Sequence, residues 1–447
     1  LIQPPMGGYG LTSLAVVEPL GLECIAGGLE DIYKIDLLDM RFDKNLERAL
    51  IRFDPDVVAV TASTTEVKNA HSILKKVREL KPHPLTVVGG FHPTLRPRDL
   101  EADYIDAVVR GEGESTFREC LKAYVEGKTF KGIPGMSYYD RSNERLVHNA
   151  DRPQIEDLDE LHHPYRKPVE KHRRKYNLIF WQPLTSLETA RGCPYRCTFC
   201  VVWKIYHGTY RVKSPKRVVE ELETIKEKHI LIVDDNFLQD VKRVEKICGE
   251  ILQRGIKKKF GIGARADSMA RNPGIVKQLA DAGLGFAVVG FEALTNSQLL
   301  AIRKRATVEE NEIAIKLLHD HGVKIWGTFV VDSNFTKEDF KALLDYVVRH
   351  DIEFPQYTVL TPLPGSDLFD EKRDELMTFD WEHYDTLRTV LPTKLPLHVF
   401  NREMEKLYRG SYLAPKRLLR RLFNLDYPFW KFPGFLKLLN SLRTYKL

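Results

Sequence analysis

Short apolar runs alternate with amphipathic segments over the first 125 residues of the chain. Residues 57–61, 85–90 and 107–114 each begin with an apolar run and predict strands, and residues 66–80 repeat their apolar positions with the period of a helix. Strands and helices that alternate at this spacing form parallel βαβ units, so we predict a doubly wound α/β sheet. Ligands of such sheets bind beyond the carboxyl ends of the strands.

A second set of strand-like runs follows after a connector. Residues 126–181 are rich in Pro, His, Asp and Arg, and we predict a linker with a short hairpin there. Six apolar runs separated by helical patterns then predict a partial α/β barrel over residues 182–375, with its chemistry at the carboxyl ends of the strands. Residues 376–447 are basic and aromatic, and we predict that they are helical. The six runs are 187–190, 230–233, 260–264, 286–289, 325–331 and 356–360.

Composition and charge narrow the classes of protein that this chain fits. A chain of 447 residues is longer than one hydrophobic core usually accommodates, so we expect more than one domain. Its composition, with 43% hydrophobic and 29% charged residues, is typical of a globular protein. No apolar stretch has the length of a transmembrane helix. The net charge of +6 is spread along the chain, so we predict no nucleic-acid partner. The apolar start at Leu1 is interpreted as a trimmed N-terminus that enters a first strand.

A group of three cysteines is the most informative motif. Cys193, Cys197 and Cys200 lie within eight positions, directly after the first predicted barrel strand. Three thiolates on one loop can ligate three irons of a [4Fe-4S] cubane and leave the fourth iron open for another ligand. Structural zinc is the alternative, with His207 as a fourth ligand. Cysteine used this unevenly is unlike a secreted disulfide framework, so we predict a cytoplasmic protein. The other cysteines, predicted to be small core residues, are Cys24, Cys120 and Cys248.

The spacing Cys-x3-Cys-x2-Cys, with Phe199 before the last cysteine, resembles the cluster loop of the radical S-adenosylmethionine (SAM) enzymes. In that family the open iron binds the amino and carboxylate groups of SAM, and reductive cleavage of SAM gives a 5′-deoxyadenosyl radical. The resemblance implies an external electron donor such as flavodoxin or ferredoxin. It also implies that residues at the ends of barrel strands contact SAM, namely Asp234, Asp235, Arg265 and Glu292. The structural alternative is a strand-end cap for the two aspartates and ion pairs for the other two.

The upstream sheet carries a second resemblance. Segments 55–61, 88–94 and 110–114 resemble the Rossmann-like domain of the cobalamin-binding radical SAM class, which includes methylases and the oxygen-independent Mg-protoporphyrin ester cyclase. The resemblance implies that cobalamin binds at the strand ends, where glycines let the backbone approach a bulky ligand. The Asp-x-His-x-x-Gly segment that supplies a cobalt ligand in other cobalamin proteins is absent from this sequence, and we do not expect His92 to replace it. The implied contacts are Ser63, Thr64, Gly89, Gly90, Gly111 and Glu112.

These resemblances imply a methyltransferase in which a substrate radical receives a methyl group from methylcobalamin. Such a mechanism needs no general base on the protein, so no catalytic residue is assigned. One alternative keeps both cofactors but performs oxidation, ring closure or rearrangement. Another is a non-enzymatic iron-sulfur carrier. A tRNA methylthiolating enzyme is disfavoured because no further cysteine cluster precedes the barrel.

The end of the sequence bears on the substrate. Residues 418–439 mix Lys and Arg with leucines and aromatic residues. Stretches of this kind lie in membrane interfaces, so we predict peripheral contact with the inner face of the membrane and a small, lipid-like substrate. The domain layout resembles that of the hopanoid C-3 methylases. The structural alternative is a helix that closes the bottom of the barrel or covers the substrate cavity.

Overall fold

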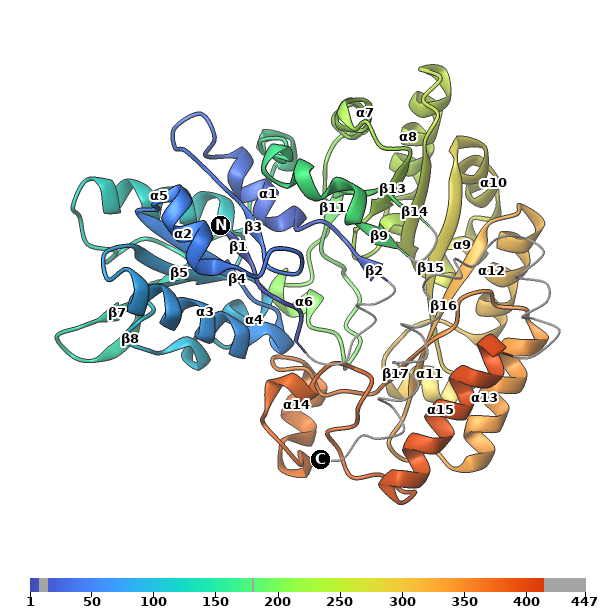
Figure 1. Cartoon of the computed structure of the whole chain (residues 1–447). Helices are drawn as coiled ribbons and strands as arrows, with labels where there is room; N and C mark the ends of the chain where they lie inside the picture. The colour runs from blue at the N-terminus through green and yellow to red at the C-terminus, as the bar shows by residue number, and fades with distance from the viewer. Residues whose placement is uncertain (8–14, 179–180, 414–447) are drawn as a thin grey trace.

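The computed structural model describes residues 1–7, 15–178 and 181–413. Two β-sheets, the first mixed and the second parallel, each with its own hydrophobic core, form two units that lie side by side, with the earlier unit at the left in Figure 1. The chain is therefore an α/β protein with two successive sheets.

The first sheet has the strand order β3-β1-β4-β5-β6-β7-β8, and the strands from β3 to β6 are parallel. Neighbouring residues of β4 point to opposite faces: Val58 and Val60 pack with α2 and α3, whereas Ala59 packs with α5. Both faces are covered, which confirms the doubly wound sheet. The strands are β1 (Ile2–Gln3), β3 (Leu38–Asp39), β4 (Val57–Thr61), β5 (Leu85–Gly89), β6 (Ala107–Val109), β7 (Met136–Asp140) and β8 (Arg145–His148). The helices are α1 (Leu20–Gly27), α2 (Leu46–Phe53), α3 (Val67–Leu80), α4 (Phe91–Leu95) and α5 (Gly113–Val125).

Two details of this unit differ from the sequence-based expectation. The strand predicted over 107–114 ends at Val109, because Gly111 has a φ of 73° and turns the chain into α5. The hairpin of β7 and β8 also belongs to the first sheet, since β7 pairs antiparallel with β6. The connector thus extends the sheet before it leads to the second unit.

The second sheet has six parallel strands that follow one another in chain order, with β10 and β17 as its edges. The barrel is therefore partial. Its first strand lies three residues earlier than expected and ends at Leu187, and a short pair of β11 (Ala190–Arg191) and β12 (Arg211–Val212) brackets the cysteine loop. The six strands are β10 (Leu184–Leu187), β13 (His229–Ile232), β14 (Lys259–Ala264), β15 (Leu284–Glu292), β16 (Lys324–Val331) and β17 (Gln356–Val359). The main helices are α7 (Pro215–Thr224), α8 (Val241–Gln253), α9 (Ala266–Arg271), α10 (Pro273–Ala282), α11 (Asn296–Ala301), α12 (Val308–Asp320) and α13 (Lys337–Arg349).

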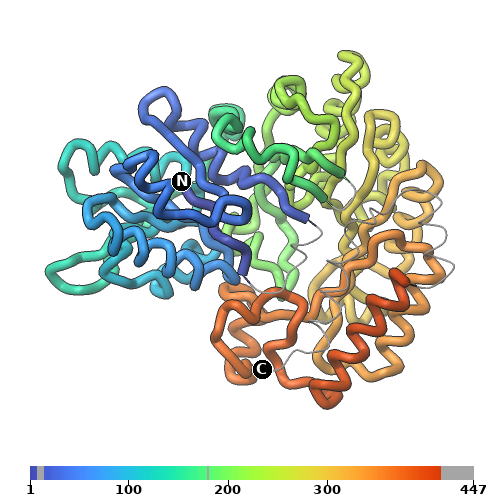
Figure 2. The backbone as a smooth tube through the Cα atoms, in the orientation of Figure 1, coloured from blue at the N-terminus to red at the C-terminus, as the bar shows by residue number. Residues whose placement is uncertain are grey.

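Apart from a 3-10 turn at Trp381–His383, the described segment after the barrel is helical only in its last part, α15 (Leu397–Leu413). The expected helix from residue 376 does not form over the preceding stretch, where Pro392 and Pro396 lack a backbone donor and disfavour helical residues before them. Figure 2 shows this stretch running back towards the first unit, where Trp381 lies 5.3 Å from the His92 ring. The tail predicted to contact membranes, residues 418–439, lies outside the described residues.

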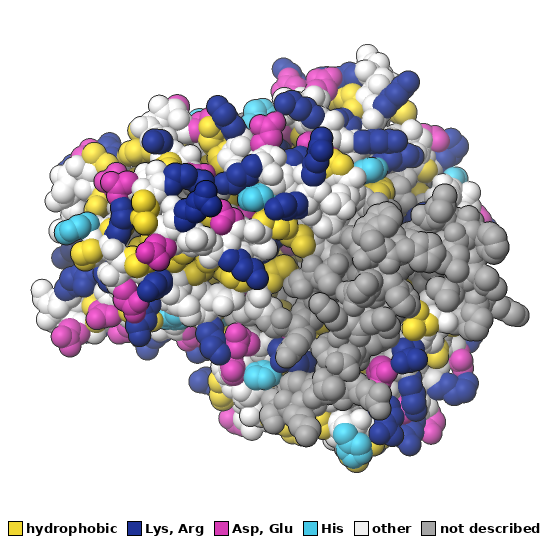
Figure 3. All heavy atoms as spheres, viewed as in Figure 1, with side chains coloured by type: hydrophobic (Ala, Val, Ile, Leu, Met, Phe, Trp, Pro, Cys, Tyr) yellow, Lys and Arg dark blue, Asp and Glu magenta, His cyan; other side chains and the backbone are white. Residues whose placement is uncertain are grey.

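The described surface carries charges of both signs. On the face in Figure 3, Lys and Arg side chains are interspersed with Asp and Glu. Within the described ranges, no helix combines the length and apolar character that crossing a bilayer requires.

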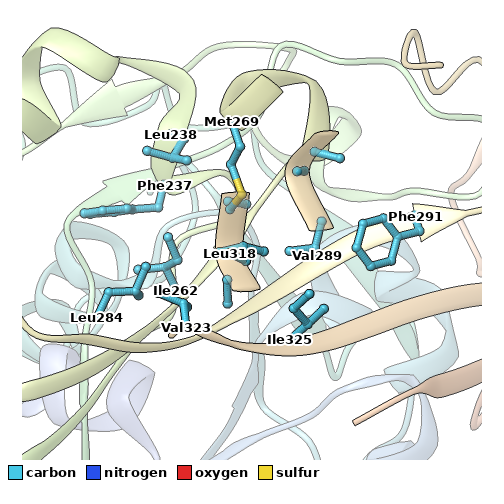
Figure 4. Packing of buried hydrophobic residues seen from close by; sticks show 14 of the residues in the cluster. Phe237, Leu238, Ile262, Met269, Leu284, Val289, Phe291, Leu318, Val323 and Ile325 are labelled. Atoms are coloured by element: carbon cyan, nitrogen blue, oxygen red, sulfur yellow. The ribbon is translucent and has the colours of Figure 1, made fainter. Parts of the chain in front are cut away.

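The core of the second unit lies between its sheet and the outer helices. Ile262, Val289 and Ile325 from three neighbouring strands pack in one cluster with Met269 of α9 and Leu318 of α12 (Figure 4). Burial of each such side chain stabilises the fold by about 1.5–3 kcal/mol relative to exposure. This packed layer holds the strand ends, where the candidate site residues lie.

Candidate functional site

A cavity of about 590 Å³ lies between the two units. It is bounded on one side by the carboxyl ends of β4, β5 and β6 and on the other by residues that flank the cysteine loop. Thr64 and Asp234 are not among its lining residues, although each is next in sequence to a residue that is. The other expected site residues outside the lining are Arg265, Glu292, Cys193, Cys197 and Cys200. The expected site residues that do line it are Ser63, Gly89, Gly90, Gly111, Glu112 and Asp235.

The two glycines at the end of β5 have different roles. Gly90 has a φ of 114°, and a Cβ atom there would lie 2.8 Å from the Ala62 carbonyl oxygen and 2.9 Å from Thr61 Oγ1. A Cβ atom on Gly89 would approach Val109 only at 3.5 Å, an ordinary contact. The turn itself therefore requires glycine at 90, whereas Gly89 leaves room on the cavity side.

Ser63, Thr64 and His92 lie next to the carboxyl ends of β4 and β5, and of the three only Ser63 lines the cavity. The Ser63 backbone N–H donates to Glu66 at 2.9 Å and fixes the turn after β4. His92 is fully buried; its Nδ1 lies 3.3 Å from the Thr64 hydroxyl and its Nε2 lies 3.1 Å from Asp99 Oδ2. Both ring nitrogens of His92 thus have protein partners, and the side chain does not line the cavity.

Glu112 is held in a buried ion network that joins the two units. Its carboxylate accepts from Arg191 Nη1 at 2.8 Å and from Arg211 at 2.9 and 3.0 Å. Arg191 also binds Glu114 at 2.7 Å and Glu188 at 2.9 Å. Burial alone would raise the pKa of Glu112, but the hydrogen bonds from Arg211 and Arg191 outweigh it and lower the pKa. The first unit is therefore tied to the residue two positions before Cys193.

The cysteine loop brings its three sulfurs together. Cys197 is buried, and Cys193 and Cys200 are partly exposed. Burial, together with the charges of the neighbouring cysteines, raises the pKa of Cys200 to about 12. Burial also raises the pKa of Cys193, although the Arg265 charge opposes this. A bound metal centre such as an iron-sulfur cluster would favour the thiolate forms of Cys193 and Cys200, because a coordinated thiol is deprotonated.

The entry to the loop is set by Gly192, whose φ is 88° and whose N–H donates to Asp235 Oδ2 at 3.0 Å. No group of three or more His, Cys, Asp and Glu side chains surrounds a single metal position in the described part of the chain. In a cubane each thiolate binds a different iron, so the sulfurs stand further apart than the ligands of one ion. The donor set of the loop fits such a cluster.

The two aspartates after β13 differ in their surroundings. Asp234 is buried and accepts from the Thr189 backbone N–H at 2.6 Å and from the Thr189 hydroxyl. Burial raises its pKa to about 6. Asp235 lines the cavity, where its side chain is exposed. Desolvation by the surrounding protein raises the pKa of its carboxyl as well. Asp234 thus has the contacts of the strand-end cap, and Asp235 is open to a ligand.

Arg265 and Glu292 are both buried and both paired. Arg265 Nε donates to Asp267 at 2.9 Å, and its guanidinium lies 3.5 Å from the centre of the Tyr195 ring in the cysteine loop. Glu292 accepts from Lys304 Nζ at 2.7 Å. The two residues therefore have the ion pairs of the structural alternative, and Arg265 also supports the loop.

The sequence alone does not identify Arg191, Tyr195 or Lys304 as residues of the site. Arg191 and Tyr195 flank the first cysteine, and a charged residue in an apolar strand end signals a buried pair, since buried charges need partners. No local pattern marks Lys304. Of the other cysteines, Cys120 and Cys248 lie in the core as expected, whereas Cys24 lines the cavity.

Comparisons with known proteins agree with this geometry. Residues 7–121 match the B12 binding domain and residues 187–347 match the Radical SAM superfamily. The hopanoid C-3 methylase of Methylococcus capsulatus is 30% identical over 403 residues, covering 89% of this chain and 76% of that protein. The anaerobic magnesium-protoporphyrin IX monomethyl ester cyclase of Rubrivivax gelatinosus is 30% identical over 419 residues, covering 91% of this chain and 73% of that protein.

A solved structure shares the arrangement of both units. The cobalamin-dependent SAM radical enzyme OxsB, with aqua-cobalamin and SAM bound, superposes with a TM-score of 0.76 at 20% identity. The superposition covers 99% of this chain and 70% of that chain. This chain therefore belongs to the cobalamin-binding radical SAM enzymes, whose cofactors are a [4Fe-4S] cluster, SAM and cobalamin.

Proposed function

We propose that this protein is a methyltransferase that acts on an unactivated carbon of a small, lipid-like molecule such as a hopanoid. The observation that supports this most is the single cavity that joins the strand ends of the first sheet to the flank of the cysteine loop. A substrate carbon between two cofactors can lose hydrogen and gain a methyl group without leaving the site, so a shared cavity suits this chemistry.

In this proposal Cys193, Cys197 and Cys200 hold three irons of the cluster. When bound, the cluster and SAM supply a 5′-deoxyadenosyl radical, and cobalamin supplies a methyl group. The cluster also needs an external electron donor such as flavodoxin or ferredoxin.

We propose the role of each residue from whether it lines the cavity and whether it already has partners in the protein. Asp235 contacts SAM directly, whereas Asp234, Arg265 and Glu292 hold the strand ends around it. At the cobalamin side, Gly89 leaves space for the corrin. Thr64 and Glu112 act through the residues they bind, and Ser63, Gly90 and Gly111 shape the turns at the strand ends.

We assign the chain to four regions on the same grounds. Residues 1–125 are the cobalamin domain, whose sheet the hairpin of the linker 126–181 extends. Residues 182–375 are the radical SAM barrel, and residues 376–447 are the C-terminal region.

SAM and cobalamin together are also compatible with reactions other than methyl transfer. The cyclase relative at 30% identity favours a second candidate, an oxidative ring closure or rearrangement without net methyl transfer. The two candidates differ in the fate of the SAM methyl group.

Transfer of a labelled methyl group separates these candidates. Anaerobically reconstituted protein is incubated with dithionite, SAM that carries a ¹³C-methyl group, and a hopanoid-containing lipid extract. We expect 5′-deoxyadenosine and a lipid that carries the label. The control is a variant with Cys193, Cys197 and Cys200 replaced by Ala, which should form neither product. 5′-Deoxyadenosine without any labelled lipid would contradict methyl transfer to a lipid and favour the second candidate.

The lipid-like substrate and a peripheral membrane position on the cytoplasmic side rest on two observations. One is the hopanoid C-3 methylase relative. The other is the composition of residues 418–439, in which basic side chains could meet anionic headgroups, each adding about 1 kcal/mol near such a surface.

Liposome binding tests the membrane contact. The full chain should co-sediment with anionic liposomes at low salt and dissociate as salt rises, because the attraction is screened. A chain that ends at Ala414 keeps α15 and should not bind, while its melting temperature stays unchanged. Neutral liposomes are the control. Equal sedimentation of the shortened and full chains would contradict the proposal.

A further inference from the structure

We infer that a groove lined by arginines on the outside of the cysteine loop is the docking surface for an acidic protein that carries single electrons. The inference rests on the proposed function, because it names the place where the reducing electron enters. The groove has a volume of about 580 Å³ and is separate from the cavity between the two units. Its lining includes Arg196, Arg271, Arg303, Arg305, Leu300 and Glu310.

The groove is attached to the cysteine loop. Arg196 belongs to that loop, between Cys193 and Cys197, and is exposed. On the opposite wall, the Ile302 carbonyl accepts a hydrogen bond from the Thr198 backbone N–H at 3.2 Å. The shortest path from the groove into the protein therefore leads to the residues between the cysteines.

A second link runs through Arg265. Its guanidinium donates to the carbonyl oxygens of Lys304 and Arg305 and lies 3.5 Å from the centre of the Tyr195 ring. The same side chain thus holds the groove wall and the cysteine loop together. Electron transfer favours such a short, rigid connection between the docked carrier and the cluster.

The backbone of the wall directs its arginines outwards. Arg303 and Arg305 have φ values of 53° and 54°, which side-chain-bearing residues rarely adopt. Lys304 between them is buried and bound to Glu292, while both arginines are exposed. Strained backbone persists where the surroundings impose it and is frequent at functional sites.

Charge and shape favour an acidic protein as the occupant. Among the described residues, the ion pairs of the groove involve Arg303 with Asp367 at 3.0 Å and Arg271 with Glu310 at 2.7 Å, whereas none involves Arg196, which lies over the Trp203 ring, or Arg305. The charges of Arg196 and Arg305 are therefore not neutralised by a carboxylate. Leu300 is 78% exposed in the same groove. An apolar side chain among arginines is typical of a protein contact, since arginine is enriched and apolar residues lie at the centre of interfaces. Opposite charge would speed the encounter, as short-lived electron-transfer complexes require.

The redox step involves one electron. The carrier is oxidised by one electron, which reduces the cluster from the 2+ to the 1+ state before SAM is cleaved. A reduced flavodoxin of strongly acidic surface is a suitable probe, and dithionite is a reductant that needs no docking surface.

The test is a double charge reversal, Arg303→Glu with Arg305→Glu, in the reconstituted holoenzyme. With reduced flavodoxin, the rate of 5′-deoxyadenosine formation should fall at least tenfold; with dithionite, it should stay within twofold of wild type. Binding of oxidised flavodoxin, measured directly by calorimetry, should weaken by at least tenfold. The matched control is Lys242→Glu with Lys246→Glu on α8, where both lysines are exposed, and it should change none of these values.

The outcomes are distinct. Unchanged flavodoxin binding and flavodoxin-driven rate in the double variant would overturn the inference, and so would an equal loss with flavodoxin and dithionite. A wild-type protein that forms no 5′-deoxyadenosine with dithionite would instead reject the proposed function. The binding measurement still decides the docking surface in that case, because it needs no turnover.

Discussion

At the scale of single residues, adjacent identical side chains have unequal environments. Asp234 and Asp235 follow one another after β13, yet one carboxylate is buried against Thr189 and the other faces the cavity. Gly89 and Gly90 differ in the same way, since only Gly90 has a backbone conformation that requires glycine. Residues that are adjacent in the chain therefore differ in their surroundings: one of each pair is fixed by other protein groups, and the other leaves its side towards the cavity open.

The buried carboxyl of Asp234 makes stability depend on pH. Its folded-state pKa of about 6 lies above the ordinary value of 3.8, so the folded state holds a proton that the unfolded state has lost. The associated stabilisation is present below pH 3.8 and disappears as pH rises through 6. We expect the melting temperature of the apoprotein, relative to that of Asp234→Asn, to be higher at pH 5 than at pH 7.

The Asn side chain does not titrate, so the variant serves as the reference at each pH. A difference in melting temperature that is the same at both pH values would contradict the assignment. Replacing exposed Asp281, whose partner is Lys277 on the same helix, is the control and should show no such pH dependence.

At the scale of elements, α15 completes the edge of the barrel. Phe400, Met404 and Leu407 belong to the barrel core, although the helix follows the last strand by many residues. The Tyr408 hydroxyl donates to the Tyr357 carbonyl at 2.9 Å and accepts from the Tyr357 backbone N–H at 3.2 Å. The helix thus satisfies backbone groups at the start of edge strand β17.

Removal of this hydroxyl tests the role of α15. Tyr408→Phe leaves two buried backbone groups of Tyr357 without this partner, which costs about 1–3 kcal/mol for an unsatisfied buried group. We expect the free energy of unfolding, measured with urea, to fall by that amount. Tyr412→Phe, which loses a partly buried bond to the Pro355 carbonyl, is the comparison and should cost less. Equal stability of Tyr408→Phe and wild type would rule out this role.

At the scale of the whole molecule, the two units meet around Arg191. This single guanidinium binds carboxylates on both units: Glu112 and Glu114 after β6, and Glu188 before β11. Arg191 is only 6% exposed, so the pairs are shielded from solvent. Arg191, together with Arg211, which also binds Glu112, therefore links the cobalamin domain to the strands that bracket the cysteine loop.

Loss of that charge should separate the units. Arg191→Met leaves the partly buried carboxylates of Glu114 and Glu188 without this partner, and breaking pairs with a buried charge in this way costs up to about 3–5 kcal/mol. We expect a loss of that size in urea unfolding and lower cobalamin retention after gel filtration. Arg254→Met, which removes the more exposed pairs with Glu250 and Glu223, should cost less than about 1 kcal/mol. Similar losses in both variants would contradict a special role for Arg191.

The sequence alone determined the features that depend on local pattern. Apolar runs and helical periods predicted both sheets, and the spacing of Cys193, Cys197 and Cys200 indicated the cluster loop, because both signals lie within short stretches of chain. Strand ends were predicted to within a few residues. The exception is β6, which ends at Val109 because the turn at Gly111 rather than the apolar pattern ends the strand.

Only the tertiary structure shows which candidates line the cavity and which are buried in pairs with other protein groups. Glu112 could be read from the sequence as a cobalamin contact, but its partner Arg191 is 79 positions away. Arg303 and Arg305 meet Arg196 in one groove although about a hundred residues separate them in the chain. Burial and pairing of charges arise from such long-range contacts, so no local pattern can specify them, whereas strands, helices and a three-cysteine loop are defined by their nearest neighbours.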